Sequence, residues 1–251
     1  GGKRLEAMVG KEQRQIDYRE LVTKLIAPVQ NEGRVIMDIS QSDLSAETKA
    51  DGSPVTKADH AAEAILLAEI ATLAPSIQII SEENVVSHNL AASQEFFLVD
   101  PLDGTKEFIK ACGDGAFTVN IGLIKNAEPV MGIVFAPALD RLFFGSLGNG
   151  AFEISGGICR QIRVRMPPVE GPVAVASASH RDAQTNQWLE KRGITNSIAI
   201  GSSLKFCLIA AGEADLYPRY GPTMEWDTAA GDAVLRAAGG RVTAEDGKSF
   251  S

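Results

Sequence analysis

Apolar residues recur every three or four positions in two segments of the first half of the chain. The first segment covers residues 17–40, with Pro28 inside it, and the second runs from Thr56 to about Leu73. This spacing places the apolar side chains on one face of an α-helix. The pattern therefore predicts two amphipathic helices, separated by a loop that is rich in turn residues.

Short apolar runs bounded by turn residues follow the second helix and predict strands. They are IQIIS (77–81), FFLV ending at Asp100 (96–99), FTVNIGLI (117–124), PVMGIVFAP (129–137), RLFFGSL (141–147) and QIRVR (161–165). We expect these strands to form a mostly antiparallel sheet that packs against the two helices.

From about residue 172 the pattern changes to an alternation of strands and helices. Strands are predicted at 173–177, 197–201, 216–220 and 241–245, and helices at 182–192, 202–215 and 227–240. Such β-α-β-α order is typical of a layered α/β unit. We therefore predict an α/β fold with two halves, an N-terminal α+β half at 1–172 and a C-terminal α/β half at 173–251.

The composition is that of an ordinary soluble protein with an acidic balance. Of 251 residues, 45% are hydrophobic and 22% charged, and the formal net charge is −8. This charge argues against a broad surface for a nucleic-acid polymer or an anionic membrane. An anionic substrate would need a local positive group to offset the field, and a metal ion is the obvious candidate.

The three cysteines are widely spaced and form no C-x-x-C pair, so we expect reduced thiols in a cytoplasmic protein. No window approaches the ~18 apolar residues of a membrane span, and the charged N-terminus lacks the apolar region of a signal peptide. Because the chain begins with Gly1 rather than methionine, we expect part of its N-terminus to be non-native. It stops in mid-pattern at Ser251, so we expect the natural chain to continue.

Acidic residues gather where the predicted elements begin or end. They are Asp59, Glu82, Glu83, Asp100, Asp103 and Asp227. Strand ends and helix starts are where α/β proteins collect ligand groups. Oxygen donors without histidine or cysteine partners suit Mg²⁺, Mn²⁺ or Ca²⁺ better than zinc, and the three histidines have no zinc-site spacing.

The densest group of these residues is DPLDGT (100–105). On a tight turn, aspartates three positions apart face the same side and can bind cations together. Pro101 stiffens the turn, Gly104 lets the backbone approach an anion, and the Thr105 hydroxyl can hold a water molecule. Taken alone, the segment also fits a structural turn, but the carboxylates at other element ends weigh against that reading. The sequence has no P-loop, H-E-x-x-H or G-x-S-x-G motif.

Four motifs in order resemble those of the inositol monophosphatase superfamily. They are DGSPVTKAD (51–59), SEEN (81–84), DPLDGTKEF (100–108) and WDTAAGDAVLRAAGG (226–240). The resemblance spans about residues 45–245 and implies a layered α-β-α-β-α sandwich. Lys106-Glu107-Phe108 and the segment 200–231 are similar to the branch of 3'(2'),5'-bisphosphate nucleotidases. The loop 110–116 departs from the family by being slightly longer.

The resemblance also implies roles for individual residues. The metal ligands it implies are Glu82, Asp100, the carbonyl of Leu102, Asp103 and Asp227. Asp59 and Thr105 would position and deprotonate the attacking water, with Glu82 in the same catalytic group and Glu83 as a neighbouring helper. The implied cofactor is Mg²⁺, as two or three ions, with Mn²⁺ as a substitute and Li⁺ or Ca²⁺ as inhibitors.

A nucleotide bisphosphate needs a second anion site besides the reacting phosphate. Lys205, on the predicted helix that follows GSS (201–203), is the candidate, with Ser203, His180 and Arg181 as further nucleotide contacts. The scissile phosphate would lie near Asp103, Gly104, Thr105 and Asp227.

The implied reaction is hydrolysis of the 3'-phosphate of adenosine 3',5'-bisphosphate, a by-product of sulfate activation, to AMP and phosphate. The partner is thus a small nucleotide rather than a nucleic-acid polymer. Two alternatives stay open. One is an inositol-1-monophosphatase or a related sugar-phosphate phosphatase. The other is a metal-binding regulatory protein that kept the fold and lost catalysis, which predicts loss of Asp59 or Thr105, although both are present.

Overall fold

The computed structural model describes residues 17–42, 46–48, 54–82, 94–104, 108, 115–177, 182–220 and 225–243. For residues 39–42, 46–48, 54–59, 61, 62 and 225–227 the description covers the backbone alone.

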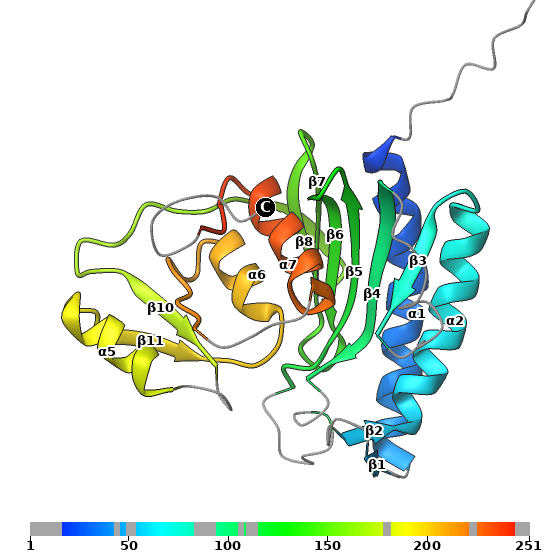
Figure 1. Ribbon diagram of the computed structural model, residues 1–251, viewed down its shortest axis with the longest axis horizontal. Coiled ribbons are helices and arrows are strands. Elements are labelled where there is room, and N and C mark those ends of the chain that lie inside the picture. The colour runs from blue at the N-terminus through cyan, green and yellow to red at the C-terminus, as the bar shows by residue number, and fades with distance from the viewer. Residues whose placement is uncertain are drawn as a thin grey trace, which may run out of the picture.

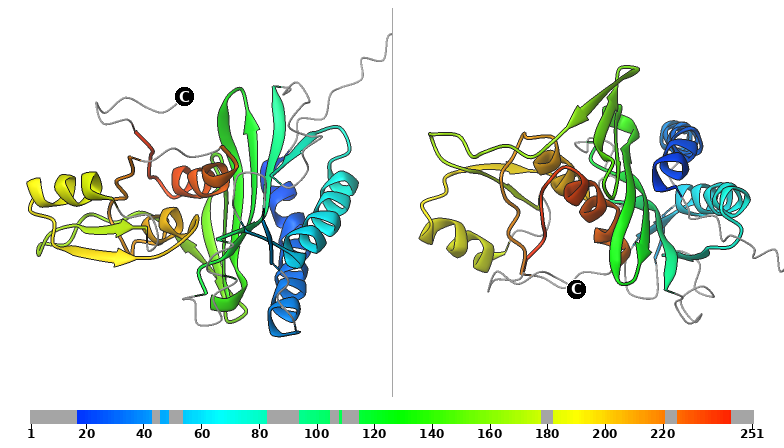
Figure 2. Two further views of the ribbon diagram at one scale, coloured as in Figure 1. Left: turned by 60° about the horizontal axis from the view of Figure 1, so that its bottom comes forward. Right: turned by 90° about the horizontal axis from the view of Figure 1, so that it is seen from above.

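The molecule is built from five layers (Figure 1). Helices α1 (Tyr18–Ser42) and α2 (Lys57–Leu73) cover one face of a seven-stranded sheet. Helices α6 (Leu204–Ala210) and α7 (Glu225–Ala237) lie on its other face. The pair β10 (Val173–Ala176) and β11 (Asn196–Ala199) forms the next layer, and α5 (Ala183–Lys191) lies beyond it. Figure 2 shows the same order from two other sides, and it confirms the predicted α-β-α-β-α sandwich.

The central sheet has the strand order β3-β4-β5-β6-β7-β8-β9. Its strands are β3 (Gln78–Ser81), β4 (Glu95–Asp103), β5 (Thr118–Lys125), β6 (Glu128–Ala136), β7 (Arg141–Ser146), β8 (Gly150–Ser155) and β9 (Ile158–Ile162). Among the described strand pairs of this sheet, only β3–β4 is parallel. The expected mostly antiparallel sheet is therefore confirmed, with a parallel pair at one edge.

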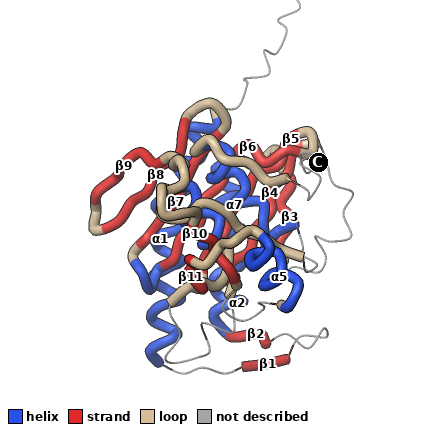
Figure 3. The backbone as a smooth tube through the Cα atoms, turned by 90° about the vertical axis from the view of Figure 1, so that its left-hand side faces the viewer, coloured by secondary structure: helices blue, strands red, loops and turns tan. Residues whose placement is uncertain are grey.

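Three smaller elements complete the description. The strands β1 (Ala46–Thr48) and β2 (Pro54–Thr56) form an antiparallel pair just before α2 (Figure 3). A short 3₁₀ helix, η1 (Pro137–Leu139), joins β6 to β7. No helix in the described ranges is both long enough and apolar enough to cross a bilayer.

Several element boundaries differ from the sequence prediction. The strand β8 was not predicted, and β9 begins three residues before the predicted QIRVR strand. The predicted strand 216–220 is reduced to one bridge, between Leu216 and Ala174, because Pro218 has no N–H to extend a ladder. Helix α6 is shorter than predicted: Ser202 has a φ of 58° and Gly212 a φ of 73°, and neither conformation continues a helix. The strand predicted at 241–245 lies partly outside the described residues.

Glutamate 32 lies inside the apolar stripe of α1. Its neighbours on that stripe, Leu25, Val29 and Ile36, and Glu32 itself all have no exposed surface. Within the described part of the chain, neither of its carboxylate oxygens has a hydrogen-bond partner. Burial therefore raises the pKa of Glu32 to about 7, and the charge of Glu69 adds to the increase. The carboxyl group is held protonated through mildly acidic pH.

An ion-pair network connects the outer strands of the sheet to the segment that follows α6. Glu153 on β8 is 2% exposed and accepts hydrogen bonds of 2.6 Å from both Arg141 and Arg160. Burial alone would raise the pKa of Glu153, but the two guanidinium groups outweigh burial and hold the pKa below its usual value. Arg141 also donates a hydrogen bond of 2.9 Å to Glu213. The network therefore joins β7, β8 and β9 to the segment after α6.

A row of glycines determines how closely α7 approaches the sheet. Glycines occupy paired positions on three neighbouring strands, namely Gly122, Gly132 and Gly145. A Cβ on Gly145 would lie 2.7 Å from the Cβ of Ala237, and a Cβ on Gly132 would clash with the carbonyl oxygen of Ala230. Because these strands present no side chain there, α7 rests directly on the sheet backbone. This contact fixes the helix whose first turn carries Asp227.

We expect Gly132→Ala to destabilise the fold by about 3 kcal/mol, because a buried backbone oxygen cannot move away from the added methyl group. The matched control is Gly156→Ala, at a turn with a φ of 58° and open space around it. That change should cost about 1 kcal/mol, for the left-handed conformation alone. Denaturant unfolding measures both values, and equal losses would contradict the close packing of α7.

Glu32→Gln tests the buried carboxyl group. The pKa of Glu32 is about 7 in the folded protein, whereas that of an ordinary glutamate is 4.5. The contribution of the protonated carboxyl group to the free energy of unfolding is therefore complete below pH 4.5 and is lost as the pH rises to 7. The loss amounts to about 3 kcal/mol. The glutamine variant should lack this component in a series of unfolding curves from pH 4.5 to 8. The exposed variant Glu20→Gln should keep the wild-type dependence, and the idea fails if Glu32→Gln keeps it too.

Candidate metal and substrate site

The parallel pair of strands brings two acidic residues to one edge of the sheet. Ser81 on β3 lies opposite Val99 on β4, and the N–H of Glu82 donates a hydrogen bond of 3.1 Å to the carbonyl oxygen of Val99. The pairing therefore extends one residue past β3. It places Glu82 beside Asp100, because the carboxyl ends of parallel strands meet at the same edge.

A β-bulge brings Asp100 and Asp103 to the same face of β4. Asp100 pairs with Asn120 and Asp103 with Thr118, so three steps on β4 match two steps on β5. In a regular strand, residues three apart point to opposite faces, and the extra residue reverses that. The sequence predicts a turn that starts at Asp100. The strand instead continues to Asp103, and the bulge produces the shared face.

The backbone around the two aspartates is tightly organised. Asp100 is 1% exposed, and its Oδ1 accepts a hydrogen bond of 3.2 Å from the N–H of Leu102. Gly104 has a φ of 82°, a conformation that favours glycine. Its carbonyl oxygen accepts a hydrogen bond of 3.0 Å from Phe108, whose ring packs edge-on against Phe117. Gly104 is thus tied to Phe108, and Phe108 to Phe117, which precedes β5.

Asp103 is joined to the segment that leads into α6. Its Oδ2 accepts a hydrogen bond of 3.0 Å from the backbone N–H of Ser203. The Ser203 hydroxyl is within hydrogen-bond distance of both Asn120 and Thr118 on β5. Ser202 donates a hydrogen bond to the carbonyl oxygen of Ala116. The start of α6 is therefore attached to the strands that carry the aspartates.

Lys205 lies on α6, two residues after Ser203. It is 5% exposed, and its Nζ is 5.3 Å from the centroid of the Tyr217 ring. The hydroxyl of Tyr217 accepts a hydrogen bond of 3.3 Å from Arg219. Burial raises the pKa of Tyr217; the charge and hydrogen bond of Arg219 oppose that increase, and the charge of Asp103 adds to it. Two cations and Asp103 thus lie around one neutral phenol.

The other predicted site residues are placed only in part. Asp59 lies in the first turn of α2 and Asp227 in the first turn of α7, with side chains outside the description. Thr105, Glu83, His180 and Arg181 lie outside the described residues. Among the described side chains, no three acidic, histidine or cysteine groups lie close enough together to hold a metal ion. The predicted ligand set additionally includes the Leu102 carbonyl and Asp227.

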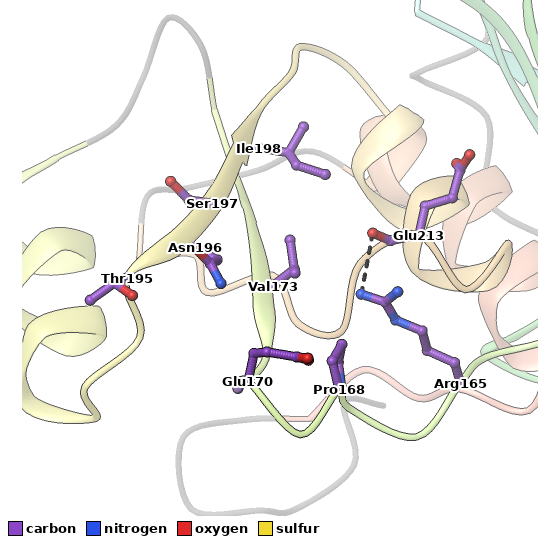
Figure 4. Close-up of a pocket in the computed structure, with 10 residues that line it drawn as sticks. Arg165, Pro168, Glu170, Val173, Thr195, Asn196, Ser197, Ile198 and Glu213 are labelled. Atoms are coloured by element: carbon purple, nitrogen blue, oxygen red, sulfur yellow. Dashed lines mark hydrogen bonds between the residues drawn. The ribbon is translucent and has the colours of Figure 1, made fainter.

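A pocket of about 670 Å³ lies elsewhere, between β10, β11 and the segment before them (Figure 4). Val173 and Ile198 contribute apolar side chains to it. Arg165 on its rim donates a hydrogen bond of 3.5 Å to the carbonyl oxygen of Glu213 and forms an ion pair with Asp215. None of the described predicted site residues lines this pocket.

Sequence reasoning missed the polar residues that support the site. Thr118 and Asn120 are 0% and 2% exposed, and Tyr217 lies under Lys205. A signal for the first two was available. They stand two positions apart in the otherwise apolar run FTVNIGLI, and such a pair shares one face of a strand.

Comparisons with known proteins identify the family of the chain. The sequence profile described as "Inositol monophosphatase family" matches residues 17–251. The chain belongs to the inositol monophosphatase family. Members of this family are generally metal-dependent phosphatases.

Within the family, the chain is similar to several proteins named CysQ. The chain is 44% identical to the 3'(2'),5'-bisphosphate nucleotidase CysQ of Escherichia coli over 221 residues, which is 87% of this chain and 88% of the relative. The Salmonella typhimurium CysQ is also 44% identical, over 88% of this chain and 89% of the relative. The crystal structure of CysQ from Bacteroides thetaiotaomicron superposes with a TM-score of 0.72 at 35% identity, covering 90% of this chain and 89% of that one.

Proposed function

We propose that this protein hydrolyses the 3'-phosphate of adenosine 3',5'-bisphosphate to AMP and phosphate, with Mg²⁺ as its cofactor. The observation that carries the proposal is the 44% identity to enzymes named 3'(2'),5'-bisphosphate nucleotidase over 87% of the chain. The edge of the sheet that carries Glu82, Asp100 and Asp103 supports a metal-assisted phosphatase, because it gathers oxygen donors. The buried Lys205 on the neighbouring helix supports a substrate with a second anionic group.

The residues present fit a magnesium site. Glu82, Asp100, Asp103 and the carbonyl of Leu102 offer oxygen donors, and Asp227 adds another from the start of α7. Oxygen donors of this kind suit Mg²⁺. The Asp103 carboxylate is also oriented by the Ser203 N–H at 3.0 Å, and such outer hydrogen bonds commonly orient metal ligands.

When bound at these residues, Mg²⁺ offsets the charge of the phosphate and makes a water molecule more acidic. The chain itself binds and orients the reactants. Thr105 holds the attacking water, and Asp59 accepts its proton. The backbone N–H groups at Gly104 and at the N-terminus of the 13-residue helix α7 would be the donors to the phosphoryl oxygens, which would favour the negative charge that the transition state spreads over them.

The second phosphate of the nucleotide lies at Lys205. This lysine is buried beside an aromatic ring, so its charge is less screened than that of a surface lysine. Ser203 and His180, with Arg181, complete the proposed nucleotide site, next to Asp103 and Asp227.

The proposed setting is the cytoplasm, where the enzyme removes a by-product of sulfate activation. Cys159 and Cys207 are free thiols, which suits a reducing compartment. The proposed enzyme accepts Mn²⁺ in place of Mg²⁺ as its cofactor, and Li⁺ or Ca²⁺ inhibits its hydrolysis of the nucleotide. The boundary between the two halves near residue 172 stays a prediction.

Phosphate release from three substrates tests the proposal directly. We expect adenosine 3',5'-bisphosphate to be hydrolysed with a higher kcat/KM than inositol 1-phosphate or fructose 1,6-bisphosphate, and only with Mg²⁺ present. The reason is that only the nucleotide presents both a 3'-phosphate and an anion for Lys205. Faster turnover of inositol 1-phosphate would replace the assignment by an inositol monophosphatase. Bound metal without turnover of any of the three would favour a regulatory protein.

Asp103→Asn should lower kcat by about 100-fold or more while leaving the fold intact, because the amide keeps an oxygen for the Ser203 N–H but loses the charge that holds the metal. The matched control is Asp140→Asn, since Asp140 also accepts a backbone hydrogen bond, of 2.8 Å from Gly156, on an exposed turn. Its kcat should equal that of the wild type. Steady-state kinetics and circular dichroism give both results, and full activity of Asp103→Asn would remove Asp103 from the metal site.

A further inference from the structure

Three buried polar side chains form a closed hydrogen-bonded ring behind the two aspartates. Thr118 and Asn120 come from β5, and Ser203 comes from the residue before α6. They are 0%, 2% and 2% exposed. Asn120 Nδ2 lies 2.9 Å from Thr118 Oγ1, Thr118 Oγ1 lies 3.1 Å from Ser203 Oγ, and Ser203 Oγ lies 2.5 Å from Asn120 Oδ1.

The direction of each hydrogen bond in the ring can be deduced. Asn120 Nδ2 also lies 3.3 Å from the backbone carbonyl of Thr118. A carbonyl only accepts, so the amide NH₂ must point toward Thr118 and Oδ1 toward Ser203. The Ser203 hydroxyl therefore donates to Oδ1, which leaves the Thr118 hydroxyl as the donor between the two Oγ atoms. Each hydroxyl donates once and accepts once around the ring.

The ring joins two parts of the proposed site. Thr118 lies opposite Asp103, and Asn120 lies opposite Asp100, across the β4–β5 pair. Ser203 donates its backbone N–H to Asp103 Oδ2 at 3.0 Å, and Lys205 follows two residues later on α6. A ring with all donors aligned strengthens each of its members and makes their positions mutually dependent.

We propose that Thr118, Asn120 and Ser203 are positioning residues, whose ring holds the Ser203 N–H on Asp103 and so fixes Asp103 relative to Lys205. The inference rests on the proposed function and deepens it. It gives Ser203 a specific role: the hydroxyl proton is committed to Asn120, so the residue acts through its backbone and not as a hydroxyl donor to the nucleotide.

Three variants of the full chain separate positioning from ordinary packing. Thr118→Val keeps the shape and removes the hydroxyl, Ser203→Ala opens the ring at another member, and Thr118→Ser restores a hydroxyl. The matched control is Ser146→Ala on β7, since Ser146 is 2% exposed and accepts a hydrogen bond of 2.9 Å from Asn149.

Calorimetric titration with Mg²⁺, without substrate, measures metal affinity. KM and kcat for adenosine 3',5'-bisphosphate are measured separately, and thermal unfolding reports stability.

We expect Thr118→Val and Ser203→Ala each to weaken Mg²⁺ binding by about 5- to 10-fold, the effect of one hydrogen bond, and to raise KM by a similar factor. Thr118→Ser should bind Mg²⁺ within about 2-fold of the wild type. Ser146→Ala should lower the unfolding temperature and leave Mg²⁺ affinity and KM unchanged. If Thr118→Val does not fold, Ser203→Ala decides.

The two possible failures are distinguishable. Wild-type Mg²⁺ affinity and KM in folded Ser203→Ala and Thr118→Val, despite lowered unfolding temperatures, would overturn the inference and leave the proposed function intact. If the wild type neither binds Mg²⁺ nor hydrolyses the nucleotide, the proposed function fails, and the positioning role fails with it.

Discussion

The convergence of like charges at one edge of the sheet is the constraint on which the site depends. Glu82 and Asp100 are brought together by the parallel β3–β4 pair, and Asp103 is turned to the face of Asp100 by a bulge. Like charges gathered at one edge of a sheet repel one another unless a cation or a donor lies between them. In a chain with a net charge of −8, the surrounding field adds to that repulsion. The architecture therefore has to hold these groups in place against their own electrostatics.

Packing against both faces of the sheet meets this requirement. On one side the apolar stripe of α1 packs on the sheet, and on the other α7 rests on the glycine row. Between them, the ring of Thr118, Asn120 and Ser203 ties β5 to α6. Arg141 on β7 makes a second connection, because it donates hydrogen bonds to Glu153 on β8 and to Glu213 after α6. Polar groups thus join the sheet, which carries the aspartates, to α6, which carries Lys205. A shift of α6 relative to the sheet would separate the aspartates from Lys205.

The layers and most elements could be predicted from the sequence, because apolar periodicity reports which face of a helix or strand is buried. The helix from about Thr56 to Leu73 is an example, since the structure has it at Lys57–Leu73. The bulge in β4 could not be predicted, because it depends on pairing with β5, a distant segment. The same holds for the ring, in which Ser203 lies 83 positions from Asn120. Glu32 shows a different limit: its spacing fits the buried stripe, but its charge favours exposure.

The glycine row has a consequence for how sharply the position of Asp227 is defined. Glycine and alanine have no side-chain rotamers, so where α7 lies over the glycine row the contact loses no rotamer entropy on folding and has no alternative side-chain packing. An interface of leucines could shift by exchanging rotamers as the temperature rises. Over the glycine row only the backbone could move, and the carbonyl oxygen of Ala230 already occupies the space that a Cβ on Gly132 would need. The position of α7, and with it the first turn that carries Asp227, is therefore set over the glycine row by the close approach of two backbones.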